Sequence, residues 1–168
     1  MKKMTKFWRY YIKFIYFFIP DGPDGDGARG NLYRPFLKKC GKNFKLATQS
    51  FIYNPNGLSV GDDVYVGFSS YIGQGDVVLE DEVLIGNFVS ITAINHLKTN
   101  GSYRFGGLER GEIHIGRGTW IGAQACILAG VKILAGSLVG AGAVVTKSTD
   151  FKDAFIAGVP AQFVKIIS

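Results

Sequence analysis

The chain contains only two histidines, which are the side chains best suited to accept a proton near neutral pH. His114 stands between Ile113 and Ile115. Because side chains alternate along a strand, two inward isoleucines would point His114 outward to solvent. His96 instead opens an irregular segment, residues 93–112, and irregular segments on rigid scaffolds commonly carry functional sites. A lone histidine does not decide the matter, so a catalytic and a merely solvated His96 both stay open at this point.

The other reactive side chains do not indicate metal or redox chemistry. Cys40 and Cys126 lie far apart and match no metal or redox motif, so we interpret them as reduced thiols of a cytoplasmic protein. Asp21, Asp24 and Asp26 miss the spacing of a calcium loop and lack its closing glutamate. We therefore expect no metal site.

The basic residues are concentrated at the N-terminus. The net charge is +6, and five lysines and arginines fall within the first thirteen positions without an acid among them. The rest of the chain is close to neutral, and it shows no zinc-finger or aromatic RNA-binding signature. We therefore expect no nucleic-acid partner. A length of 168 residues suits one domain with a short appendage.

A six-residue repeat predicts the scaffold that must position these side chains. From residue 113 the chain divides without a gap into IHIGRG, TWIGAQ, ACILAG, VKILAG, SLVGAG and AVVTKS. A large aliphatic recurs at the third place of each block, and a small or apolar residue stands two places before it. Residues two apart lie on one face of a strand, whereas a period of six requires a turn after every short strand. The pattern therefore predicts a parallel β-helix with a narrow, stacked aliphatic core.

The same frame occurs earlier in the chain. It includes Val60, Val66, Ile72 and Val78, and after a one-residue slip it resumes at Ile85 and Ile91. A weaker outlying coil is expected near Leu46 and Ile52. Asp76 then falls at an inward position, either facing a substrate or capping a buried turn.

Three segments do not follow the repeat. Residues 1–20 are rich in aromatic and basic side chains, and DGPDGDGARG, residues 21–30, is predicted to be a turn-rich linker before a short helix over Asn31–Cys40. The expected division is an N-terminal helical segment and linker, 1–43, followed by the β-helix domain, 44–168. Residues 93–112 interrupt the coils as a protruding loop, and an insertion of this length is typical of a functional site.

Specific motifs add a family resemblance over roughly residues 58–166. VLIGNFVSITAINH, TWIGAQACILAGVKI, VVTKS and GVPA resemble the hexapeptide-repeat acyltransferases, nearest the maltose, galactoside and polysaccharide O-acetyltransferases. The resemblance implies an all-β fold: a left-handed parallel β-helix of about five coils with a protruding loop and a short N-terminal helical segment. It also implies a homotrimer with sites between adjacent subunits, and acetyl-CoA as the co-substrate.

The resemblance also assigns site residues. His96 matches the catalytic histidine, which would act as a general base without an acyl-enzyme. The matching acetyl-CoA positions are Trp120 near the thioester, Ala123 and Ala141 along the coil edge, Thr146 and Lys147 beside the nucleotide, and Lys165 in the tail. We assign Asp76 and Asn95 to the acceptor. Two positions depart from the family pattern, because Gly67 replaces an acceptor-binding asparagine and Gln162 replaces a basic tail residue.

The leading hypothesis is therefore a CoA-dependent O-acetyltransferase that modifies a sugar hydroxyl, free or lipid-linked, during assembly of a capsule, O-antigen or exopolysaccharide. An N-acetyltransferase acting on an amino sugar or a nucleotide-linked amino sugar is the first alternative. A carbonic-anhydrase-like metalloenzyme would require three convergent histidines, and this chain has two. A non-catalytic scaffold is the remaining alternative.

The N-terminal segment, residues 1–19, has two interpretations. Lys2, Lys6, Arg9 and Lys13 recur at helical spacing beside many aromatic residues, and the apolar run after Lys13 is too short to span a bilayer. Such a helix suits the headgroup region of an anionic leaflet, which would place a cytoplasmic protein peripherally on the inner face of the membrane. Alternatively, the helix covers the open end of the β-helix.

Overall fold

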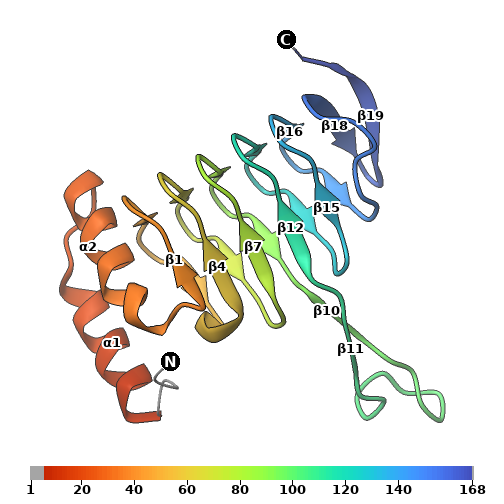
Figure 1. Cartoon of the computed structure of the whole chain (residues 1–168). Coiled ribbons are helices and arrows are strands. Elements are labelled where there is room, and N and C mark those ends of the chain that lie inside the picture. The colour runs from red at the N-terminus through yellow and green to blue at the C-terminus, as the bar shows by residue number, and fades with distance from the viewer. Residues whose placement is uncertain (1–5, 168) are drawn as a thin grey trace.

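Three parallel sheets form the faces of a triangular prism in the computed structural model, which describes residues 6–167, with the backbone alone for residues 6–9 and 13 (Figure 1). Sheet A contains β1 (Lys39–Cys40), β4 (Leu58–Val60), β7 (Val77–Leu79), β12 (Ile113–Ile115) and β15 (Lys132–Ile133). Sheet C contains β3 (Phe51–Ile52), β6 (Tyr71–Ile72), β9 (Ser90–Ile91), β14 (Cys126–Ile127) and β17 (Val144–Val145). Sheet B contains β2 (Lys45–Leu46), β5 (Tyr65–Val66), β8 (Leu84–Ile85), β13 (Trp120–Ile121), β16 (Leu138–Val139), β18 (Ala154–Gly158) and the antiparallel β19 (Ala161–Ile166).

The chain visits the sheets in the order A, B, C and advances by one strand in each at every turn. Five complete coils result. After β17 the chain passes sheet A without a strand, and β18 then joins sheet B as part of a sixth coil. This confirms the predicted left-handed parallel β-helix, including the weak first coil, whose inward residues are Leu46 and Ile52. Hydrogen bonds between coils run along the prism axis, so every coil depends on its neighbours for its backbone partners.

One or two aliphatic side chains from each parallel strand after β1 point into the prism and are buried. Ile85, Ile91, Ile115, Ile121 and Ile127 are fully inaccessible to solvent. The frame differs from the prediction at one place. In β7 the inward residues are Val77 and Leu79, whereas Val78 faces outward, so the one-residue slip precedes this strand and lies in the turn after Ile72. Asp76 belongs to that turn and is exposed, so its predicted inward position is wrong.

The N-terminal segment forms two helices, α1 (Lys6–Phe18) and α2 (Pro23–Tyr33), which cover the first coil (Figure 1). The short 3₁₀ helices η1 (Arg34–Phe36) and η2 (Pro55–Gly57) follow. The predictions of a linker over 21–30 and a helix over Asn31–Cys40 are therefore wrong, since α2 occupies most of the first range and β1 ends the second. The glycines of α2 permit close contact: a Cβ on Gly30 would lie 2.0 Å from the carbonyl oxygen of Phe44.

A buried arginine joins both helices to the first coil. Arg29 is inaccessible to solvent, and its Nε donates to the carbonyl oxygen of Leu46 at 2.9 Å. Its other nitrogens donate to Asp26 and to the carbonyl oxygens of Ile19 and Pro20, just after α1. These contacts support the covering role that was one of the two interpretations of the N-terminus.

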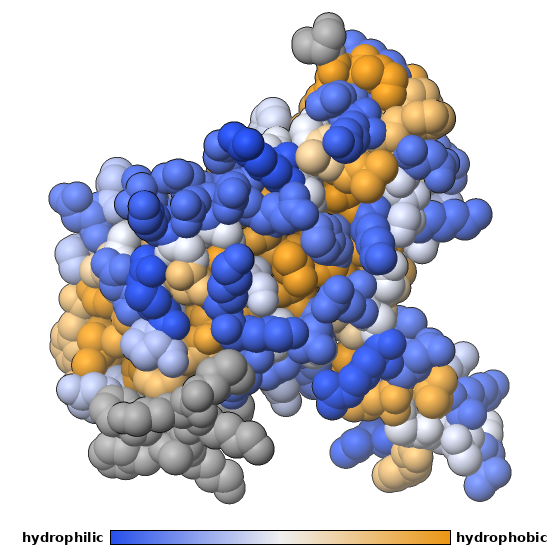
Figure 2. Space-filling view, in the orientation of Figure 1, coloured by the Kyte–Doolittle hydropathy of each residue, from blue (hydrophilic) through white to orange (hydrophobic). Residues whose placement is uncertain are grey.

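The insertion at residues 93–112 forms a hairpin that projects from the prism, and we call it the arm (Figures 1 and 2). Its paired strands are β10 (Ile94–His96) and β11 (Leu108–Arg110), in antiparallel register. The arm leaves at the end of β9 in sheet C and returns at β12 in sheet A. No helix among the described residues is long and apolar enough to cross a bilayer.

Candidate active site

Two edges of the prism carry nearly all the predicted site residues. We call the line of turns from sheet C to sheet A the CA edge, and the line from sheet B to sheet C the BC edge. Asp76 and the arm residues Asn95 and His96 belong to the CA edge, whereas Ala123 and Ala141 belong to the BC edge. Trp120 lies on sheet B, just before the BC edge.

On the CA edge, the arm presents polar side chains to solvent. His96 is exposed at the end of β10, opposite Leu108 of β11. The side-chain amide of Asn95 lies 3.5 Å from Oε2 of Glu109, across the arm. Asp76 lies beside the base of the arm, because its carbonyl oxygen accepts the backbone N–H of Ile113 at 3.1 Å. An exposed imidazole, an amide and a carboxylate therefore share one edge.

The BC edge changes character along the prism. In the second and third coils its turns carry Phe68 and Phe88, whose rings meet edge to face at 5.3 Å. In the fourth and fifth coils the equivalent part of the edge carries Ala123 and Ala141, stacked one coil apart by the register of β13 and β16. A Cβ on Gly122 would lie 2.6 Å from the backbone nitrogen of Ala141, so adjacent turns are in close contact.

The change from phenylalanine to alanine along the BC edge bears on whether the fourth and fifth coils can bind an extended ligand such as the pantetheine of acetyl-CoA. Small side chains leave backbone groups of the turns accessible, whereas the phenylalanine pair covers them. We call the part of the BC edge that carries Ala123 and Ala141 the open stretch. Trp120, which is 50% exposed, lies just before it. The residues present therefore fit an extended chain along the fourth and fifth coils.

The remaining predicted residues lie near the C-terminal end. Thr146 and Lys147 follow β17 and are exposed on the CA edge. Lys147 and Gln162 both line a cavity of about 150 Å³ between the last coil and the β18–β19 hairpin. Lys165 lies on β19 opposite Phe155 and does not line this cavity. The structure thus brings Lys147 close to Gln162, one of the two positions that depart from the family pattern.

A single chain does not bring the two groups together. The arm with His96 leaves from the CA edge, whereas Trp120, Ala123 and Ala141 lie on or beside the BC edge, across sheet C. If His96 and the open stretch serve one reaction, a second copy of the chain must supply one of them. The geometry is what a site between subunits requires.

His114 points outward as predicted, but it has a partner that the sequence did not reveal. Its Nε2 lies 2.6 Å from Oε1 of Glu80, and Oε2 of Glu80 accepts the backbone N–H of Arg117 at 2.8 Å. The hydrogen bond from His114, followed by that from Arg117, lowers the pKa of Glu80 below its usual range. Glu80 and His114 meet because β7 and β12 are neighbours in sheet A, although 34 residues separate them.

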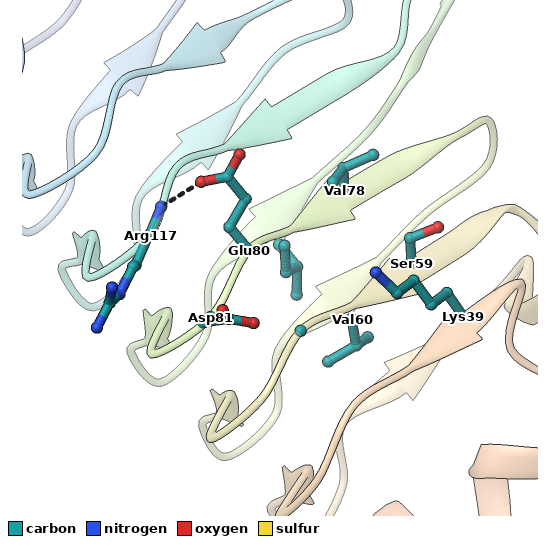
Figure 3. Close-up of a pocket in the computed structure, with 9 residues that line it drawn as sticks. Lys39, Ser59, Val60, Val78, Glu80, Asp81 and Arg117 are labelled. Atoms are coloured by element: carbon teal, nitrogen blue, oxygen red, sulfur yellow. Dashed lines mark hydrogen bonds between the residues drawn. The ribbon is translucent and has the colours of Figure 1, made fainter.

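Glu80 also lines a shallow cavity of about 260 Å³ on the outer face of sheet A (Figure 3). Figure 3 shows Lys39 and Ser59 at one side and Asp81 and Arg117 at the other. Several of the charged groups have partners: the guanidinium of Arg117 binds Glu82 at 2.6 Å, and Oδ1 of Asp81 accepts the N–H of Asp62. We therefore assign no ligand to this cavity. Among residues 6–167, no group of three or more histidine, cysteine, aspartate or glutamate side chains could hold a metal ion.

Comparison with known proteins gives the family. Residues 112–147 match the repeat family described as bacterial transferase hexapeptide (six repeats), and residues 57–93 match the hexapeptide repeat of succinyl-transferase. Galactoside O-acetyltransferase of Escherichia coli is 26% identical over 92% of this chain and 76% of its own length. Serine acetyltransferase 2 of Arabidopsis thaliana is 33% identical over 75% of this chain, which spans only 38% of that enzyme.

The fold is also that of a solved acetyltransferase. A maltose O-acetyltransferase from Clostridium difficile superimposes with a TM-score of 0.82 over 98% of this chain and 90% of its own, at 21% identity. Both repeat matches stop at the arm, since one ends at residue 93 and the other begins at 112. The repeats, the relatives and the fold agree with the motifs around His96 and Trp120: the chain belongs to the hexapeptide-repeat acetyltransferases and is an acyltransferase.

Proposed function

We propose that this protein transfers the acetyl group of acetyl-CoA to a sugar hydroxyl during surface-polysaccharide synthesis. The observation that carries the proposal is the shared position of His96, Asn95 and Asp76 on the CA edge. Imidazole, amide and carboxylate groups can bind hydroxyls and remove a proton from one of them. The galactoside and maltose specificities of the relatives point to the same class of acceptor.

His96 is the proposed general base. Its unprotonated ring nitrogen accepts the hydroxyl proton as the sugar oxygen attacks the thioester carbonyl, forming the new C–O bond. The C–S bond then breaks, and the proton leaves with the CoA thiolate as a thiol. Asp76 and Asn95 hold neighbouring hydroxyls. No protein nucleophile is used, and neither cysteine lies on the arm or among the proposed acetyl-CoA residues.

The acetyl-CoA residues are Trp120, Ala123, Ala141, Thr146, Lys147 and Lys165. Trp120 lies against the thioester end, and the two alanines let pantetheine reach the turns of the BC edge. Lys147 and Lys165 supply positive charge for phosphates. The proposed active assembly is a homotrimer, because the CA and BC edges of one chain are separated by sheet C; an active monomer in sedimentation would contradict it.

Filling the BC edge should block acetyl-CoA. Ala141 is exposed, so Ala141→Phe should fold normally while placing a ring where Phe68 and Phe88 lie on earlier coils. We expect the KM for acetyl-CoA to rise by at least about tenfold, equivalent to roughly 1.4 kcal/mol, with little change in the KM for the acceptor. Steady-state kinetics with each substrate varied in turn measures this.

Lys132→Phe is the matched control, because Lys132 is also exposed on the fifth coil but belongs to sheet A. It should leave both KM values near those of the unmodified protein. Equal effects of the two substitutions, or no effect of Ala141→Phe, would remove the BC edge from the proposed acetyl-CoA path.

Mass spectrometry tests the acceptor class. A panel of sugars, amino sugars and lipid-linked oligosaccharides is incubated with the protein and acetyl-CoA, and products are examined for an added acetyl group. Acetylation of a hydroxyl supports the proposal. Transfer only to amines would establish the N-acetyltransferase alternative, and no transfer to any saccharide would reject the proposed function.

The proposed location is cytoplasmic, with a peripheral contact to the inner leaflet through residues 1–19. Ile12 of α1 is buried against the protein, whereas Phe14, Phe17 and Phe18 are 65%, 83% and 67% exposed. One face of α1 therefore packs on the protein, and another exposes aromatic rings to solvent. The helix can cover the first coil and contact a membrane at the same time. The structure describes only the backbone of Lys6, Arg9 and Lys13. The predicted basic residue Lys2 lies outside the described residues.

Removing the exposed aromatic rings should release the protein from lipid. We expect the full-length protein to co-sediment with vesicles that contain phosphatidylglycerol and not with pure phosphatidylcholine vesicles. Phe17→Ser with Phe18→Ser should abolish most of this binding, because interfacial binding scales with the apolar area inserted. Phe151→Ser with Phe163→Ser, an exposed pair at the far end of the solenoid, should leave it intact. Vesicle binding unaffected by the first pair would refute the membrane contact.

A further inference from the structure

We infer that the acceptor is a saccharide of at least two linked rings, one at His96 and the next stacked on Tyr53. This inference rests on the proposed function, and it names a more specific class of acceptor. It follows from the way in which three successive coils stack along the CA edge below the arm.

The turns of these coils are in direct register. The backbone N–H of Tyr53 in the first coil donates to the carbonyl oxygen of Ile72, and the side-chain amide of Asn54 donates to the carbonyl oxygen of Gly75 at 3.0 Å. The N–H of Ala93, at the base of the arm, donates to the carbonyl oxygen of Gln74. Tyr53, the turn from Gly73 to Asp76, and the arm therefore follow one another along the edge.

The middle turn has little side-chain bulk. Gly73 and Gly75 are buried there, and neither position has room for a side chain. A Cβ on Gly73 would lie 2.6 Å from Cε1 of Tyr71, and one on Gly75 would lie 2.6 Å from the carbonyl oxygen of Ala93. Gly75 also has a positive φ of 89°, which strains any other residue. The half-buried Gln74 and the exposed carboxylate of Asp76 are therefore the polar side chains that this turn presents to solvent.

Tyr53 is held in place as an aromatic surface at the lower end. The residue is 44% exposed, and its ring meets that of Phe51 edge to face, with the centroids 6.3 Å apart. Phe51 in turn stacks on Tyr71, with centroids 6.1 Å apart and planes 12° from parallel. The ring is thus supported from one side and presents apolar surface with a polar hydroxyl, a combination that suits the C–H groups and hydroxyls of a sugar ring.

The length of this surface favours more than one ring. Successive coils are about 4.8 Å apart, so Tyr53 lies about 10 Å along the prism axis from the base of the arm. A single pyranose ring covers roughly half of that distance. A ring bound beside Asp76 for reaction at His96 would leave Tyr53 uncovered, whereas a linked second ring would reach it. An oligosaccharide, including one carried on a lipid, fits this edge better than a free monosaccharide.

The test compares matched one-ring and two-ring acceptors. Methyl glycosides of single sugars and of the corresponding disaccharides are assayed with acetyl-CoA and the full-length protein. For the two-ring acceptors, Tyr53→Ala should raise KM roughly three- to tenfold, the range for a lost ring contact, with kcat unchanged. KM for one-ring acceptors and for acetyl-CoA should not change. Tyr53→Phe should restore most of the loss, and Tyr65→Ala, an outward tyrosine on sheet B, should have no effect on acceptor KM.

The outcomes separate this inference from the proposed function. Equal kcat/KM for one-ring and two-ring acceptors, or an unchanged KM in Tyr53→Ala, overturns the inference while sugar acetylation stands. If no glycoside in either series is acetylated, the proposed function fails and the inference fails with it.

Discussion

His96→Ala should lower kcat by roughly two to four orders of magnitude, the usual contribution of a positioned general base. The histidine is exposed at the end of β10, so its truncation removes no buried contact and the fold should persist. Acetyl-CoA binding should also persist, because the proposed binding residues lie on other turns. Steady-state kinetics measures the loss of turnover, while calorimetry with CoA and circular dichroism monitor binding and folding.

His114→Ala is the internal control. It removes the only other histidine in the chain and breaks the contact with Glu80, which is partly exposed and so contributes little to stability. Turnover should remain near that of the unmodified enzyme, because His114 lies on sheet A and not on the arm, and surface substitutions usually change stability by less than about 0.5 kcal/mol. If His114→Ala silenced the enzyme while His96→Ala did not, the catalytic assignment would be reversed.

The six-residue period predicted the β-helix because inward aliphatics recur at Ile115, Ile121 and Ile127 without interruption. The slip before β7 was misplaced for a physical reason. Val77, Val78 and Leu79 are all apolar, so either alternate set could have faced inward. Only the stacking of β7 on β4 and β12 selects Val77 and Leu79, and that pairing is not visible within the segment itself.

The sequence identified candidate site residues, but it did not show how these residues are arranged in space. His96 and Trp120 stood out because each breaks the expectation for a solenoid surface. The separation of the CA and BC edges required the assignment of each turn to a sheet, and the contact between Glu80 and His114 depends on neighbouring coils. Tyr53 was overlooked because a tyrosine in a weak first coil has no local signal of function.

The helix α2 was missed because its glycines, Gly25, Gly27 and Gly30, are typical of flexible linkers. At Gly25 and Gly30 the missing Cβ instead permits backbone contact, and Pro23 with Asp24 and Asp26 favours a helix start. Propensity alone does not stabilise such a helix. Arg29 supplies the missing tertiary contacts. It is inaccessible to solvent and donates hydrogen bonds to Ile19 just after α1 and to Leu46 in the first coil.

Arg29→Met should destabilise the packing of α1 and α2 on the first coil, which we call the N-terminal cap, by about 3–5 kcal/mol. This is the usual cost of removing one partner of a buried ion pair. The substitution nearly preserves side-chain volume, so the loss is electrostatic. It leaves Asp26 buried without its cation, and it deprives the carbonyl oxygens of Leu46, Ile19 and Pro20 of a donor. Urea unfolding measured by circular dichroism, together with protease sensitivity of residues 1–38, should show the loss.

Arg34→Met is the matched control, since Arg34 follows α2 directly but makes one long hydrogen bond, 3.4 Å, to the carbonyl oxygen of Cys40. Its free energy of unfolding should lie within about 0.5 kcal/mol of that of the unmodified protein. In a solenoid each coil is stabilised mainly by its neighbours, so Arg29→Met should expose the first coil while later coils remain folded. Resistance of Arg29→Met to both urea and protease, equal to that of Arg34→Met, would mean that packing of the helices alone holds the cap.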